Sequence, residues 1–384
     1  MTTSSDQPDI RGFAAPGFEP LHGAFAAATL LDTRGGGALS VFHDGVLVAE
    51  LVTGTGAGSA PRTPDTTQVI FSCTKGVVAT ALLMLIERGQ LDLDAPMARY
   101  WPEFGEHGKD ELLVRHVVSH MSGQPSFRAP VSLDAFADDV FVESVVASDE
   151  PWWAPNTKIA YQSMSYGALC GGLIRRVSGE STGAFVQREI AAPLGLDLWI
   201  GLPEEREQDV APLQHIPLEE QSLATDDPAS VAQVGNPRVL HTPEVECWNS
   251  RVYHAAEIPG AGGITTATSL ARLYACLANG GSLAGRRLLR PETVELGRTT
   301  ISDGPEAFNG DPMRFGVGFM LDMATERVYD HGEFGHSGYG GQAAGAWPER
   351  NASFTYLTTA LRAGDVGDKR VALVLAALDE SLGS

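Results

Sequence analysis

The feature that most constrains the fold of this chain is a long apolar run that follows one serine and one lysine. It reads FSCTKGVVATALLMLIERG from Phe71 to Gly89, and Lys75 is its only charged residue before Glu87. Apolar side chains cover almost every side of a helix built from this segment, and such a helix belongs in the core of a large protein. The chain must therefore fold around this helix, with Lys75 drawn towards the interior.

Ser72 and Lys75 have i, i+3 spacing, so their side chains share one face of a helix. A serine hydroxyl becomes a strong nucleophile when a base takes its proton, and a lysine amine can be that base when burial lowers its pKa. Amide N–H groups at the N-terminus of the helix could also hold a developing oxyanion. The alternative is that Ser72 only caps a core helix and Lys75 reaches solvent, because S-x-x-K alone is a weak pattern.

The strand signals lie at the two ends of the chain. Near the N-terminus, two β-branched runs flank His43-Asp44-Gly45, which is a strong hairpin pattern. Near the C-terminus, AAGAWPER and SFTYLTTAL flank a turn from Pro348 to Asn351. The middle of the chain, and a segment just before the first hairpin, instead favour helices, most of which end at a glycine: FEPLHGAFAAATLLDT, SYGALCGGLIRRVSG, TGAFVQREIAAPLG and ATSLARLYACLANGG. We therefore expect an α/β (α+β) fold whose sheet unit comes from both ends of the chain.

The expected domain boundaries follow this distribution. Residues 1–90 together with 255–384 would form the sheet domain, residues 91–254 a mainly helical domain, and the active site would lie at their interface. The stretch from Pro203 to Ser230 is acidic and proline-containing, so we expect a long surface loop there.

Composition excludes several classes of partner. The chain of 384 residues has 48 acidic and 27 basic residues, a formal charge of −21, which repels nucleic acid and anionic membrane. No charged segment followed by an apolar one marks a signal peptide, and no run of about eighteen apolar residues marks a membrane span. We expect a soluble, cytoplasmic protein. Its four cysteines form no CxxC pair, so no disulfide framework or zinc cluster is indicated.

Two further segments extend the Ser72 pattern. Tyr161 and Ser163 precede a helix in PWWAPNTKIAYQSMSYGAL, and His336, Ser337 and Gly338 precede a strand in FGHSGYGGQAAGAW. With FSCTKG, these segments resemble, in the same order, the S-x-x-K, Y-x-N/S and K/H-T/S-G motifs of the serine β-lactamase and penicillin-binding-protein superfamily.

The resemblance covers roughly residues 15–360 and is closest to the family VIII carboxylesterases, which are similar to class C β-lactamases. It rests also on GQLDLDAPMARYWPEF, VRHVVSHMSGQP, IAAPLGLDLWIGLPEE, AAEIPGAGGITTATSLARLYACLANGG and GHSGYGG. It implies a β-lactamase/transpeptidase-like fold, in which helices flank an antiparallel sheet and a mainly helical domain is inserted.

The resemblance also implies roles for individual residues. Ser72 would become acylated, while Lys75 and the phenol of Tyr161 would share the proton transfers, with neither assigned as the base alone. The backbone N–H groups of Ser72 and Tyr339 would form the oxyanion hole. Ser163, where many β-lactamases have asparagine, would orient Lys75 or the substrate. No cofactor and no metal are expected.

The third motif departs from the β-lactamase pattern. His336 stands where β-lactamases usually have lysine, and a histidine is largely neutral near pH 7 unless perturbed. Together with Ser337 and Gly338, it would form a substrate-binding segment that favours neutral esters over β-lactams. Trp152 and Trp153 suggest a partly aromatic acyl site, although an ordinary core position is an equal alternative.

Three other features invite a catalytic interpretation, which we do not adopt. Ser181 is at the centre of GESTG, a G-x-S-x-G match, but a helix rather than a strand precedes it, so an N-cap is expected. His116 and His120 have the spacing of a zinc-binding helix without its glutamate, so hydrogen bonds to loop backbone are expected. Cys73 should be a small packing residue.

The sequence therefore predicts a serine hydrolase that acts on a small-molecule acyl ester or amide, most simply a carboxylesterase for small or medium acyl esters. An acyltransferase of natural-product biosynthesis, which passes the acyl group to an alcohol or amine, remains an alternative. A non-catalytic protein that binds acyl ligands is another, although all three motifs are intact. The acyl chain, the leaving group, residual β-lactamase activity and the oligomeric state do not follow from the sequence.

Overall fold

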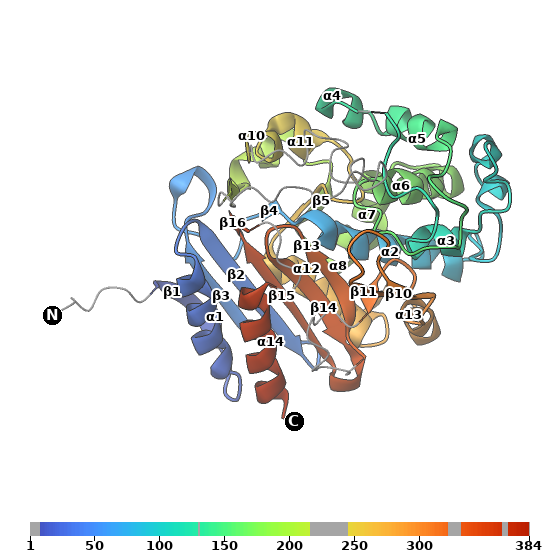
Figure 1. Ribbon diagram of the computed structural model, residues 1–384. Helices are drawn as coiled ribbons and strands as arrows, with labels where there is room; N and C mark the ends of the chain where they lie inside the picture. The colour runs from blue at the N-terminus through green and yellow to red at the C-terminus, as the bar shows by residue number, and fades with distance from the viewer. Residues whose placement is uncertain (1–7, 130, 216–244, 322–331, 363–367, 384) are drawn as a thin grey trace.

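The computed structural model describes residues 8–129, 131–215, 245–321, 332–362 and 368–383, and its centre is a nine-stranded sheet (Figure 1). The strand order is β1-β3-β2-β15-β14-β13-β12-β11-β10, and every neighbouring pair is antiparallel. The strands are β1 (Ile10–Ala14), β2 (Gly36–His43), β3 (Val46–Gly54), β10 (Ser302–Pro305), β11 (Pro312–Phe315), β12 (Met320–Leu321), β13 (Phe334–Gly338), β14 (Gln342–Trp347) and β15 (Ala352–Thr358). The predicted antiparallel sheet, built from both ends of the chain, is confirmed.

The two predicted hairpins form the middle of this sheet. β2 and β3 are joined by Asp44 and Gly45, whose φ values of 50° and 74° match the left-handed pair of a type I′ turn. β14 and β15 are joined by a turn over Pro348–Arg350, which Asn351 ends at φ 47°. Because β2 also pairs with β15, the two hairpins bring the ends of the chain together.

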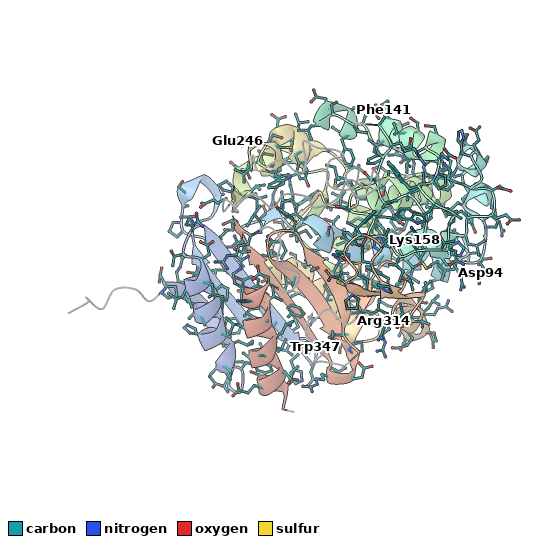
Figure 2. The ribbon with its side chains drawn as sticks, viewed as in Figure 1. Asp94, Phe141, Lys158, Glu246, Arg314 and Trp347 are labelled. Atoms are coloured by element: carbon teal, nitrogen blue, oxygen red, sulfur yellow. The ribbon has the colours of Figure 1, made fainter. Side chains whose placement is uncertain are left out.

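Helices α1 (Pro20–Leu31) and α14 (Lys369–Leu382) cover one face of the sheet (Figure 1). Alternate strand residues, such as Leu39 and Val41 on β2 and Phe354 and Tyr356 on β15, are buried against them. Trp347, labelled in Figure 2, extends this layer and stacks on Phe354 with ring centroids 5.8 Å apart. The period-two alternation of the strands thus supplies one complete core layer.

The opposite face carries α12 (Ala267–Ala278) and, towards β13, the apolar helix α2 (Thr74–Glu87). Residues Thr74 to Leu85 of α2 are all buried, so the predicted burial of this helix is confirmed. A hydrogen bond also joins α12 to the sheet: the Ser353 hydroxyl on β15 donates to the Ala271 carbonyl on α12 at 2.8 Å. This second core continues into the helical part of the molecule.

The remaining elements lie mainly beyond this face. The helices are α3 (Val114–Val118), α4 (Leu133–Phe136), α5 (Asp139–Ser148), α6 (Ser165–Ser178), α7 (Thr182–Val186), α8 (Ala192–Leu194), α10 (Val245–Trp248), α11 (Arg251–Ala255) and α13 (Pro291–Gly297). The short strands are β4 (Gln68–Val69), β7 (Gly263–Thr265) and β5 (Leu198–Ile200) in one sheet, β6 (Gln214–His215) with β16 (Ala360–Leu361), and β8 (Ser282–Leu283) with β9 (Arg286–Arg287). Single 3₁₀ or π turns occur at Ala57–Ser59, Phe71–Cys73, Met97–Arg99, Pro102–Gly105, Gln187–Ala191 and Glu204–Asp209.

The predicted glycine helix ends are confirmed with one difference. Gly179 after α6 and Gly195 after α8 are left-handed caps. After α12 the cap position is Asn279, and the left-handed residue is the next one, Gly280 at φ 63°. The segment that begins at Thr182 is not one α-helix, since a π turn separates α7 from α8.

The expected loop from Pro203 to Ser230 is only partly described. Its first part contains a 3₁₀ turn at Glu204–Asp209 and the short strand β6, and residues 216–230 lie outside the described residues. The domain boundaries at residues 90 and 254 stay a prediction. No helix in the described ranges combines the length and apolar character needed to cross a membrane.

Candidate active site

Ser72 lies on a 3₁₀ turn, Phe71–Cys73, that leads directly into α2. The α-helix itself begins at Thr74, so Ser72 sits just before the helix on which we expected it. Phe71 has φ 45°, a left-handed conformation that costs a non-glycine residue about 1–3 kcal/mol. The hydrogen bond from Ile70 N–H to the Gly263 carbonyl, 2.9 Å long, helps to hold the strained turn. Strain beside a reactive serine is typical of functional sites.

Lys75 is fully buried and points back to Ser72. Its Nζ donates to Ser72 Oγ at 3.1 Å, to the Ser163 carbonyl at 2.9 Å and to the Gly260 carbonyl at 2.8 Å. None of these partners is a carboxylate, so no paired negative charge compensates the loss of water around an ammonium group. Burial lowers the pKa of Lys75 to about 7. A large fraction of the amine is therefore neutral at neutral pH and available as a base.

The Gly260 carbonyl was not predicted as a site group. It reaches Lys75 because its loop packs tightly on α6: a Cβ added to Gly167 would lie 2.5 Å from the Gly260 nitrogen. Only glycine at position 167 permits this approach. The glycine-rich stretch IPGAGGI was the available sequence signal for a close backbone contact.

Tyr161 completes the group around the serine. Its phenol is hydrogen-bonded to the Ser72 side chain, and Lys75 Nζ lies 5.0 Å from the centre of its ring. Burial raises the pKa of this phenol well above its usual value. Tyr161 thus keeps its proton where Lys75 readily loses one. The two groups therefore differ in how readily they lose a proton, and which of them is the base stays a prediction.

Ser163 contributes differently from the expectation. Its backbone carbonyl, rather than its hydroxyl, accepts the hydrogen bond from Lys75 Nζ. A change of the side chain alone would leave this contact in place. The expected orienting role towards Lys75 therefore has a main-chain basis.

His336 is fully buried on β13, with its ring centre 6.0 Å from that of Tyr161. Its Nδ1 is 2.5 Å from the Ser337 carbonyl oxygen. Burial, and next the nearby charge of Lys75, lower the pKa of His336 to about 3. The ring is therefore neutral at physiological pH, and the third motif places no cation at this position.

The segments that carry the two expected oxyanion donors are in contact. A Cβ added to Gly338 would lie 2.5 Å from the Ile70 carbonyl oxygen, so the end of β13 lies against the turn that holds Ser72. Tyr339 follows, and within the described part of the chain its N–H donates none of the hydrogen bonds found. This geometry supports the Ser72 and Tyr339 N–H groups as an oxyanion hole, which stays a prediction.

An aromatic triangle, which sequence reasoning missed, holds these segments together. Phe71, Tyr339 and Trp248 are mutual neighbours, with ring centroids 5.5 Å apart for Phe71 and Tyr339, 5.3 Å for Phe71 and Trp248, and 5.4 Å for Trp248 and Tyr339. Tyr339 is 37% exposed, whereas Phe71 and Trp248 are buried. Trp248 follows 176 positions after Ser72, and nothing local marks it.

Trp152 and Trp153 are partly exposed rather than core residues. Trp152 Nε1 donates to the Ser126 carbonyl at 3.3 Å. The Trp153 ring lies 5.9 Å from that of Phe308 and 4.9 Å from Nζ of Lys158, which is labelled in Figure 2. Ser337 is exposed, with Oγ 3.9 Å from Met320 Sδ. A substrate contact by either tryptophan, or by Ser337 and Gly338, stays a prediction.

The features set aside on sequence grounds have structural roles. Ser181 is the N-cap of α7: its Oγ accepts from Ala184 N–H at 3.2 Å and donates to Glu257 at 2.7 Å. His116 and His120 each accept a backbone N–H at Nδ1, at 3.3 Å and 3.0 Å. Cys73 is buried and its Sγ donates to the His336 carbonyl at 3.2 Å.

The comparisons with known proteins agree with this fold. The chain is 33% identical over 386 residues to the esterase/beta-lactamase LipL of Mycobacterium tuberculosis, covering 92% of this chain and 84% of LipL. A penicillin-binding protein homologue from Caulobacter crescentus superposes with a TM-score of 0.87 at 30% identity, over 97% of this chain and all of that one. A family VIII carboxylesterase gives a TM-score of 0.87 at 29% identity, over 96% and 98% of the two chains. The beta-lactamase family model matches residues 26–378, so this chain belongs to the beta-lactamase family.

Proposed function

We propose that this serine hydrolase of the β-lactamase fold is a carboxylesterase that works through an acyl-enzyme on Ser72. One observation carries the proposal: the buried Lys75 amine is 3.1 Å from Ser72 Oγ, and its only other hydrogen-bond partners among the described residues are two backbone carbonyls. Carbonyls hold the amine in place without a negative charge that would keep it protonated. Lys75 is thereby the base.

Acylation then has a defined course for each proton. The neutral Lys75 amine takes the proton of Ser72 as Oγ bonds to the ester carbonyl carbon, and the carbonyl oxygen becomes an oxyanion facing the Ser72 and Tyr339 N–H groups. When the C–O bond to the alcohol breaks, the Tyr161 phenol donates its proton to the leaving oxygen. The proton held by Lys75 restores the phenol. Water repeats the sequence in reverse, releasing the acid and the free Ser72 hydroxyl.

A neutral ester is the substrate that the site supports best. The neutral ring of His336 offers no positive charge at the position where a lysine would bind a substrate carboxylate. The relatives support the same choice, since LipL is named an esterase as well as a β-lactamase and a structural neighbour is a family VIII carboxylesterase.

The test is intact mass spectrometry over time with p-nitrophenyl esters and a chromogenic cephalosporin, with and without alcohol or amine acceptors. We expect one acyl adduct on Ser72, release of free acid, and faster turnover of esters than of the cephalosporin. The matched pair Ser72→Ala and Ser181→Ala compares two serines of the same chain: the first should abolish labelling and turnover, and the second should leave both nearly unchanged. Labelling lost only with Ser181→Ala would refute the assignment, and a product formed mainly with an acceptor would make the protein an acyltransferase.

A further inference from the structure

Glu306 is a buried carboxylate whose hydrogen bonds lead to the catalytic tyrosine. It follows β10 and is only 4% exposed. Its Oε1 accepts the backbone N–H of Tyr161 at 3.2 Å, and its Oε2 accepts those of Phe308 at 2.6 Å and Asn309 at 3.1 Å. Within the described ranges, no ion pair involves this carboxylate. Its three partners are thus backbone donors, one of which belongs to the residue that touches Ser72.

Hydrogen bonds within the turn fix the backbone around Glu306. Glu306 N–H donates to the Asp311 carbonyl at 2.8 Å, and Gly310 N–H donates to the Glu306 carbonyl at 2.9 Å. The side chains of Asn309 and Asp311 add a hydrogen bond of 2.8 Å. A carboxylate on such a turn has a defined position and loses little further freedom when it holds a partner.

The same turn is attached to the chain just before Tyr161. Ile159 and Glu306 form a parallel bridge, and Ala307 N–H donates to the Ile159 carbonyl at 2.8 Å. On the other side of Tyr161, Gln162 N–H donates to His120 Nδ1 at 3.0 Å. Every N–H from Ala160 to Ser163 has a partner, and that of Tyr161 is Glu306.

We propose that Glu306 is a positioning residue for Tyr161: it holds the Tyr161 backbone so that the phenol faces the leaving oxygen of the ester. This inference rests on the proposed function. A partly buried N–H left without an acceptor costs about 1–3 kcal/mol, so without the carboxylate the segment would shift to find another partner. Such a shift misplaces the phenol, and proton transfer depends steeply on position.

If the proposal is right, the effect of losing Glu306 depends on the leaving group of the ester. A purely structural role would give no such dependence. An alkoxide needs a proton as it leaves, whereas a p-nitrophenolate leaves readily as an anion. If Glu306 acts through Tyr161, its loss must therefore slow alkyl esters more than p-nitrophenyl esters with the same acyl group. A general loss of folded protein would slow both esters equally.

The experiment measures kcat/KM, which reports acylation, for ethyl butyrate and p-nitrophenyl butyrate with the full-length protein. Glu306→Gln keeps the shape of the side chain but replaces one acceptor oxygen by an NH₂ group, which cannot accept from the facing N–H groups. We expect kcat/KM for ethyl butyrate to fall about 10-fold or more, and that for p-nitrophenyl butyrate by about threefold or less. Glu306→Asp, which keeps the charge, should lie between wild type and Glu306→Gln in the ratio of the two rates.

The matched control is Asp303→Asn on the same hairpin. Asp303 is exposed and pairs with Arg314, labelled in Figure 2, at 3.1 Å, so its change should leave both rates as in wild type. In a Tyr161→Phe background, Glu306→Gln should cause no further loss with ethyl butyrate, because the group it positions is already absent.

Three results would overturn the proposal: equal losses for both esters, an unchanged ratio in Glu306→Asp, or a full further loss in the Tyr161→Phe background. Because Glu306→Asp keeps the carboxylate, it decides the question even if Glu306→Gln does not fold. Failure of the proposed function looks different, since wild-type protein would then show no acyl adduct on Ser72 with p-nitrophenyl butyrate. A labelled wild type with an unchanged ratio in the variants rejects the role of Glu306 alone.

Discussion

Lys75 and Lys109 are both completely buried, but the groups around their two amines differ. Lys75 donates to Ser72 Oγ and to two backbone carbonyls, with the Tyr161 ring 5.0 Å away. Lys109 donates to the carbonyls of Val146, Ala147 and Asp149, and lies 4.7 Å from the centre of the Phe104 ring. Burial lowers the pKa of both groups, to about 7 for Lys75 and to about 8 for Lys109.

The two lysines differ in one hydrogen-bond partner and in the charged groups nearby. The hydrogen-bond partners of Lys109 are all backbone carbonyls, so the amine anchors the end of α5. The nearby carboxylates of Asp149 and Glu106 favour its charged form and partly offset the lowering of its pKa by burial. Lys75 has a hydroxyl among its partners and no carboxylate. Burial alone therefore does not make a lysine catalytic: the amine needs a neighbour whose proton it can take.

The largest effect should come from Lys75→Met, which keeps the volume of the side chain and removes the base. We expect acylation to slow by about 10³-fold or more. Stability should also fall by about 1–3 kcal/mol, because the carbonyls of Ser163 and Gly260 lose their donor. Stopped-flow burst kinetics with p-nitrophenyl butyrate measure the rate. Retained acylation in a folded Lys75→Met variant would remove the distinction between the two lysines.

The next effect should come from Tyr161→Phe, which removes only a hydroxyl beside the Lys75 pocket. Acylation by an alkyl ester should slow by about 10²-fold, since the leaving oxygen loses its proton donor. Single-turnover acylation followed by mass spectrometry gives the rate, with circular dichroism as the control for folding. A near-normal rate would mean that Lys75 performs both proton transfers by itself.

The pH dependence of the rate should distinguish the two lysines, because only Lys75 is proposed to take part in the reaction. The base must be neutral, so kcat/KM should fall about 10-fold per pH unit below about pH 7, where Lys75 becomes protonated, and level off above it. Stability should rise with pH from about 7 towards about 10.4, the usual pKa of an unfolded lysine, because the unfolded chain binds more protons in this range. If kcat/KM stays constant between about pH 5 and about pH 8, a range that includes the Lys75 pKa of about 7, the assignment of Lys75 as the base is contradicted.

The smallest effect on activity should come from Lys109→Met. Its kcat/KM and its pH profile should match wild type within about twofold, since Lys109 touches no reacting group. Its stability should fall by about 1–3 kcal/mol, because the carbonyls at the end of α5 lose their donor. Urea unfolding measures the loss. A folded Lys109→Met variant with strongly reduced acylation would show that the two pockets are coupled.

Local patterns predicted much of the fold. The Asp44-Gly45 turn, the apolar β-branched runs on either side of it and the apolar run of α2 are each local features, so a short window of sequence reports them directly. The pairing of β2 with β15 joins residues more than 300 positions apart, and the sequence predicted only that both ends contribute to one sheet, without saying which strands pair.

The residues of the candidate site also fall into those that the sequence indicated and those that it did not. Ser72 and Lys75 were recognisable because i, i+3 spacing places them together, and Tyr161 and His336 because they belong to known motifs. Gly260 and Glu306 were not recognised, since the first is 185 positions from Lys75 and the second 145 from Tyr161. Glu306 stands in a polar turn, SDGPEAFNGDP, which resembles an ordinary surface loop.

The sequence by itself determined that a serine and a lysine begin a buried helix, that hairpins at both ends of the chain form a sheet, and that the third motif has a histidine where β-lactamases usually have lysine. Only the tertiary structure showed that burial moves the pKa values of Lys75 and Tyr161 apart, which supports the proposal of Lys75 as the base. The pKa of Lys75 depends on burial by distant segments, and the position of its amine depends on the carbonyls of Ser163 and Gly260. The pKa of the Tyr161 phenol likewise depends on its own burial beside Ser72. Desolvation is a property of everything that surrounds a group, so no local spacing of residues can report it.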